Sequence, residues 1–213
     1  MDRKGMYASV SAHPELVSVK DLIGQVEDGR LVIPPIPASE ALSGETMAEV
    51  FMLMDAGYPL PPMVAWKGAD PQGEAHLIEG AMVLEGLVRY LASEGDAAMR
   101  ATGQPGGHAS DAEGIYWVLG GEGRYVAEVG EVPAEYLPVR SMLRTLDFIG
   151  FSRGLEETVG ADSAPSLVTE GEEVSQRLLN YRAVVTYFRG DAGRVRELAA
   201  ASERIGKDSR AVR

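Results

Sequence analysis

The chain contains no cysteine among its 213 residues. This absence excludes a disulfide framework, a zinc site with thiolate ligands and a cysteine nucleophile. Histidine is also scarce, because the chain has only His13, His76 and His108, and none lies three or four positions from another. A local histidine metal cluster is therefore not expected.

Long apolar runs are missing as well. No run approaches the roughly 18 to 20 residues that a membrane-spanning helix needs. The charged start, residues 1–7, is not followed by the apolar stretch of a secretory signal. Hydrophobic residues make up 45% of the chain and charged residues 24%, which is typical of a globular protein. We therefore expect a cytoplasmic, single-domain protein with no membrane partner.

Positive charge is scarce outside the C-terminal region. The net charge is −12, yet residues 182–213 contain eight basic and four acidic residues. A basic region on an acidic body can contact the phosphates of nucleic acid, or an acidic surface on its own chain or on a partner. The candidate contacts to nucleic acid or to a partner protein are Arg189, Arg194, Arg196, Lys207 and Arg210.

A strand, a glycine turn and an amphipathic helix are predicted around Gly80. An apolar run ends at Glu79, and apolar residues then recur at helical spacing over residues 84–91. A helix that starts at a glycine turn presents unpaired backbone N–H groups and the positive end of its dipole, which favour a bound anion. Glu79 opposes an anion unless a cation lies between them. Glu79 and Gly80 are therefore candidate ligand-binding residues, and an ordinary strand-to-helix connection is the alternative.

The rest of the chain predicts a mixture of helices and strands. Helices are expected over residues 20–27, 43–56, 138–149, 170–179 and 192–204, and strands over residues 31–33, 63–66, 77–78, 114–119, 124–129 and 181–188. Three prolines after residue 33 predict an edge strand. Residues 1–15 are expected to be loosely ordered, residues 94–114 to form a surface loop and residues 150–166 a connection. Because strands and helices do not alternate strictly, the predicted class is α+β.

Four segments carry a resemblance to a known family. They are Ile33-Pro34-Pro35-Ile36, Gly57-Tyr58-Pro59-Leu60-Pro61, Ile78-Glu79-Gly80 with the helix that follows, and Ser202-Glu203-Arg204-Ile205-Gly206. In this order they resemble the I-P-x-x-Q-R, G-Y-P-I-P, I-D-G-Q-Q-R-L-x-x-L and F-x-R-I-N segments of the N-terminal domain of GmrSD-type type IV restriction enzymes. That large family is related to the ParB/sulfiredoxin-like fold.

The resemblance implies a ParB/sulfiredoxin-like mixed sheet with flanking helices. It implies one degenerate domain over residues 16–205, followed by a basic tail over residues 206–213. In the family, the Q-R and D-G-Q-Q-R groups line a pocket that binds and hydrolyses nucleotides. Here Pro37, Ala38 and the apolar residues 81–83 stand at those positions, and none of them can bind phosphate through its side chain. The candidate ligand-binding residues that remain are Pro34, Glu79, Gly80 and Arg204, and no catalytic residue, metal or cofactor is expected.

Three functions follow from these observations. The first is a catalytically degenerate, stand-alone module that binds a partner protein or nucleic acid in a bacterial or phage DNA-related system, such as restriction, its evasion or defence. The second is a rebuilt phosphate-handling enzyme, an NTPase or small-molecule kinase, that uses a nucleotide with a divalent metal. It would need Glu79 and a second carboxylate, for which Glu40, Glu45 and Glu85 are the candidates. The third is a homo-oligomeric structural protein.

The surroundings of Gly80 discriminate between the first two functions. An open polar pocket there would favour the enzyme. A pocket filled by Met82 and Pro37 would favour the degenerate module.

Overall fold

The computed structural model describes residues 11–67, 73–91, 114–120, 124–128, 130–142, 145–160 and 162–189. The larger of its two sheets has five strands in the order β1-β8-β3-β4-β2. These strands are β1 Ser11–Ser18, β8 Arg182–Arg189, β3 Met63–Lys67, β4 Ala75–Glu79 and β2 Leu31–Val32. β1 is antiparallel to β8, β8 is parallel to β3, β3 is antiparallel to β4, and β4 is parallel to β2. The sheet is therefore mixed, and β2 lies at its edge as the prolines predict.

Three helices accompany this sheet, and serine residues cap the start of two of them. They are α1 Val19–Glu27, α2 Gly44–Asp55 and α3 Ala81–Leu91. The Ser18 hydroxyl accepts a hydrogen bond from the Asp21 N–H at 3.0 Å, and Ser43 caps α2 in the same way through Thr46 at 3.3 Å. Gly29 and Gly57 follow α1 and α2 with positive φ.

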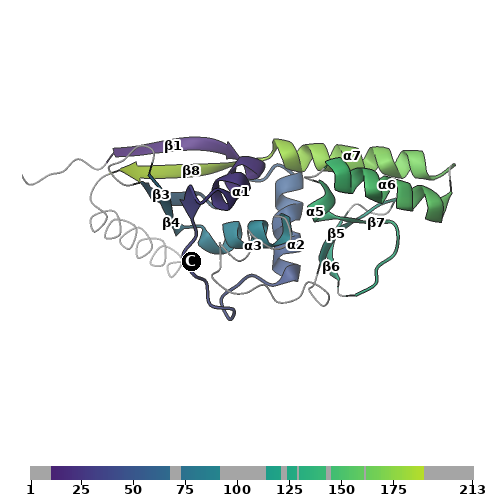
Figure 1. The fold of residues 1–213 in the computed structure, drawn as a ribbon, viewed down its shortest axis with the longest axis horizontal. Coiled ribbons are helices and arrows are strands. Elements are labelled where there is room, and N and C mark those ends of the chain that lie inside the picture. The colour runs from purple at the N-terminus through teal and green to yellow at the C-terminus, as the bar shows by residue number, and fades with distance from the viewer. Residues whose placement is uncertain are drawn as a thin grey trace, which may run out of the picture.

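A smaller antiparallel sheet and three more helices form the other end of the molecule. The strands are β5 Gly114–Val118, β6 Tyr125–Glu128 and β7 Tyr136–Pro138, in the order β6-β5-β7. The helices are α5 Val139–Met142, α6 Thr145–Val159 and α7 Ala164–Asn180. Figure 1 shows α6 and α7 extending away from the larger sheet, with α2 standing upright between the two ends. The α+β class, with a mixed sheet and flanking helices, is confirmed.

α2 ties the two ends together. Its Phe51 is fully buried, and the Phe51 ring lies 5.9 Å from the ring of Tyr125 on β6. At the C-terminal end of α2, Asp55 accepts hydrogen bonds from Arg177 of α7, one of them over 3.3 Å from Nη2 to Oδ2. The buried hydrophobic residues of both ends belong to one continuous cluster.

Two expectations about the connections are wrong. Residues 11–15 are not a frayed end, since they pair with β8 along the first half of β1. Residues 150–159 are not a connection but the continuation of α6. The connection was predicted to begin at Gly150, but an added Cβ there would meet no other atom within 4 Å, and glycine inside a helix costs only about 1 kcal/mol. The stop is Gly160, whose φ is +85°.

The chain around Pro138 also differs from the prediction. Pro138 does not begin a helix, because it is the last residue of β7, a strand that was not predicted. The helix expected over residues 138–149 divides into α5 and α6, and Ile149 on α6 is exposed. The predicted helix over residues 192–204 and the loop over residues 94–113 lie outside the described residues.

None of the helices in the described part of the chain is long and apolar enough to span a bilayer.

Phe51→Ala should lower the free energy of unfolding by about 3 to 5 kcal/mol, because it removes a fully buried ring from the joint between the two ends. Met52→Ala on the same helix should change it by less than about 0.5 kcal/mol, since Met52 is 52% exposed. Urea denaturation of both variants checks this expectation. Similar losses for the two would contradict the assignment of Phe51 to the core.

Candidate functional site

The turn at Gly80 is closed against the core. Gly80 has φ +81°, and it lies between the end of β4 and the start of α3. A Cβ added at Gly80 would lie 2.8 Å from Cγ of Met63, a side chain with no solvent exposure. Glycine is therefore required at this position for two reasons, the left-handed backbone and the close approach to Met63.

The first turn of α3 has only apolar side chains near the backbone N–H groups at the start of the helix. Ala81 and Val83 are partly buried, whereas Met82 is 46% exposed. The filling by Met82 and Pro37 that would favour the degenerate module is not observed, because both side chains are exposed and Met63 lies against Gly80 instead. None of the three side chains can donate a hydrogen bond to a phosphate oxygen. Glu79, the last residue of β4, pairs in the ladder with Val64.

Pro34 lies in a separate hollow of about 450 Å³, which we call the apolar groove. Residues that line it include Val32, Pro34, Pro35, Trp66, His76 and Ile78. The rings of Trp66 and His76 stack there with centroids 5.6 Å apart. Glu79 and Gly80 do not line the groove, so the structure does not bring Pro34 together with them. Arg204, the fourth candidate ligand-binding residue, lies outside the described residues.

The candidate carboxylates do not gather around Glu79 into a metal site. Among the described residues, no group of three or more histidine, aspartate or glutamate side chains is arranged to hold a metal ion. Glu40 and Glu45 are exposed, and Glu45 lies in the first turn of α2. Glu85 is buried, but it is already paired.

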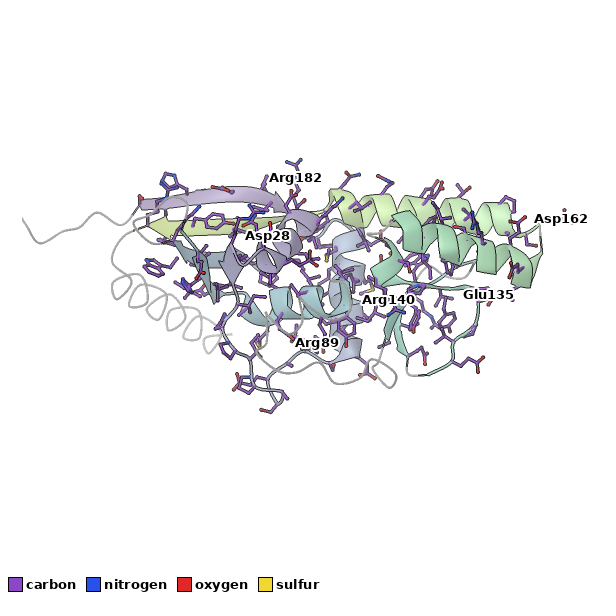
Figure 2. The ribbon with its side chains drawn as sticks, in the orientation of Figure 1. Asp28, Arg89, Glu135, Arg140, Asp162 and Arg182 are labelled. Atoms are coloured by element: carbon purple, nitrogen blue, oxygen red, sulfur yellow. The ribbon has the colours of Figure 1, made fainter. Side chains whose placement is uncertain are left out.

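Glu85 and Arg89 form an ion pair along α3. Arg89 Nε donates to Glu85 Oε1 over 3.0 Å, and Nη2 makes a shorter contact with Oε2. Arg89 Nη1 also donates to the Leu42 carbonyl over 3.2 Å, just before α2. Burial lowers the pKa of Arg89, but the hydrogen bond and the charge of Glu85 outweigh it, so the pKa is raised overall. Arg89 lies on the lower side of α3 in Figure 2. The pair fastens α3 to the segment before α2, and both oxygens of the Glu85 carboxylate contact Arg89.

A second hollow, of about 600 Å³, lies at the other end of β4 from Gly80, beside Ala75. We call it the basic hollow. Side chains that line it are His13, Glu15, Arg30, Lys67, Tyr187 and Arg189. Arg189 is the one candidate contact to nucleic acid or a partner that the structure describes, because Arg194, Arg196, Lys207 and Arg210 lie outside the described residues.

Sequence reasoning missed the other cations of this hollow. Lys67 follows the strand predicted over residues 63–66, and no role was predicted for Lys67 or Arg30. The positions of Lys67 and Arg189 were a signal for a shared surface, since each is the last residue of a strand of the larger sheet. Their pairing across parallel strands could not be foreseen, because it joins segments far apart in the sequence.

Compared with known proteins, the sequence matches no family model and has no significant match among curated proteins.

Gly80→Ala should destabilise the fold more than Gly57→Ala. Both residues have positive φ, but an added Cβ at Gly57 meets no atom within 4 Å. We expect a loss of about 1 kcal/mol for Gly57→Ala from backbone strain. Gly80→Ala should lose about 1 to 3 kcal/mol more because of the overlap with Met63. Equal losses in chemical denaturation would contradict the close contact.

Proposed function

We propose that the chain is a catalytically degenerate binding module with a ParB/sulfiredoxin-like fold. Its partner is a protein or a nucleic acid in a bacterial or phage DNA-related system, such as restriction, its evasion or defence. The main support for the loss of catalysis is the turn at Gly80. There the fully buried Met63 lies against the glycine, and the next three residues are apolar.

The order of the elements supports the fold named in this proposal. The Ile33-Pro34-Pro35 segment follows α1 and β2, and Gly57-Tyr58-Pro59 follows α2 just before β3. The strand, glycine turn and helix then come together at β4, Gly80 and α3. This order is the one that the resemblance implies. The association with restriction rests on the resemblance alone.

The enzyme alternative has less support from the same surroundings. A rebuilt site needs a second carboxylate near Glu79 that is able to bind a metal or a proton. Glu85, the buried candidate, is held by Arg89, and no metal-binding group of side chains occurs in the described ranges.

A protein partner, or a second copy of the chain, is supported by the outer face of the larger sheet. Leu16 of β1 and Val184 of β8 are cross-strand partners there, with exposed fractions of 63% and 39%. These two adjacent side chains provide apolar area that a partner would cover. Both residues lie outside the two hollows.

Nucleotide titration tests the loss of catalysis. With ATP or GTP and magnesium, we expect no saturable binding up to millimolar concentration and no release of phosphate, because the side chains that grip phosphate are absent. Isothermal titration calorimetry and a phosphate-release assay give the two readouts. Glu79→Gln is the matched control, since turnover by a contaminating enzyme would persist unchanged in that variant. Micromolar binding with turnover that Glu79→Gln abolishes would contradict the proposal.

A further inference from the structure

The basic hollow contains an arrangement of charge that folding alone does not explain. Lys67 and Arg189 are direct partners across the parallel strands β3 and β8. Neighbouring strands lie about 4.8 Å apart, so two like charges at partner positions repel each other. In the described ranges, neither side chain forms an ion pair or a hydrogen bond with another residue. A bound anion between them would relieve this repulsion.

A third cation and a neutral hydroxyl extend the same surface. Arg30 lines the hollow from the segment before β2, although Asp28 accepts from its Nη2 over 2.8 Å. The Tyr187 hydroxyl donates to Oε1 of Gln25 over 3.2 Å. Burial, assisted by the nearby Glu15 carboxylate, raises the pKa of Tyr187, so this group stays protonated and uncharged at neutral pH. Two carboxylates oppose the positive charge of Arg30, Lys67 and Arg189. They are Glu15, which lines the hollow, and Asp28, the ion-pair partner of Arg30.

This gathering of cations contrasts with the whole chain, whose net charge is −12. An acidic protein repels nucleic acid at long range, so any contact with phosphate has to come from a local cluster. The cations of the hollow come from β3, β8 and the link between α1 and β2, and they spread along the end of the sheet. Cations from three segments along one end of the sheet can contact more than one phosphate of a nucleic-acid strand.

Building on the proposed binding function, we infer that the basic hollow binds the phosphates of a nucleic-acid strand. Lys67 and Arg189 are the principal contacts, and Arg30 is a further one. The hollow is distinct from the Gly80 turn, because it lies at the opposite end of β4. It gives the module a partner class and a binding surface that do not depend on the lost nucleotide pocket.

Fluorescence anisotropy with a labelled duplex of about 20 base pairs, and with its single strand, tests the inference on the full chain. With about three phosphates neutralised, log affinity should fall with log salt concentration with a slope of about −2 to −3. The double variant Lys67→Gln with Arg189→Gln should bind about tenfold or more weakly at 50 mM salt, and its slope should be smaller by about 2.

Arg182→Gln is the matched control on the same strand. Arg182 is the first residue of β8, at the other end from Arg189, and Figure 2 shows it at the outer surface away from that end. This variant should keep the affinity and the salt slope of the wild type. The double variant should melt at the same temperature as the wild type or higher, because it removes a repulsive pair.

Several results would overturn the inference. They are the absence of salt-dependent oligonucleotide binding at 50 mM salt, an equal loss in Arg182→Gln, and a marked fall in the melting temperature of the double variant. The last result would mean that carboxylates of the chain already hold these cations. Binding of inorganic phosphate without oligonucleotide binding would identify a small-anion site instead. Equally tight binding of polyglutamate would identify an acidic protein surface as the partner.

The two proposals fail separately. Loss of the oligonucleotide interaction would leave the nucleotide titration unaffected, and the proposed module would then bind a protein. Nucleotide turnover that depends on Glu79 would overturn the degenerate module whatever the hollow binds.

Discussion

The contact between Gly80 and Met63 is the constraint on which this structure depends. It lets β4 turn into α3 with a left-handed backbone directly above a residue of the core. Met63 begins β3 and pairs with Val185 of β8, so the same side chain supports the turn and the centre of the larger sheet. The start of α3 therefore packs against buried side chains. Its apolar first turn has no charged side chain that could bind a phosphate.

The two ends of β4 differ in chemistry because of this packing. The Glu79 end of β4 adjoins the closed turn. It also adjoins the pair of Glu85 and Arg89, whose opposite charges neutralise each other. The Ala75 end opens into the basic hollow, where Lys67 and Arg189 lie side by side without a described partner. Lys67 and Arg189 thus lie at the opposite end of β4 from the turn at which the resemblance implies a nucleotide pocket.

Much of the local structure could be predicted from the sequence. Ser18, Ser43, Gly29 and Gly57 fixed the limits of α1 and α2, because caps and left-handed glycines act within a few residues. Gly150 misled the prediction of α6, since a glycine that faces open space inside a helix has the same sequence signal as a stop. The strand at residues 11–15 was missed because its support comes from β8, far away in the sequence.

The candidate site was only partly predictable for the same reason. Gly80 and Glu79 were found because a strand, a turn and a helix are consecutive. Met63 was not foreseen at that turn, because sequence order cannot tell which methionine packs against Gly80. Lys67 and Arg189 meet only through strand pairing. A surface assembled by long-range pairing has no local pattern.

The most direct test of the central claim is an NMR titration with magnesium and ATP, observed at the backbone amide of Gly80 and the methyl group of Met63. If the turn is closed on the core, both signals should stay in place up to millimolar nucleotide. A saturable shift of both signals together would show that a nucleotide enters at this turn, and it would contradict the account.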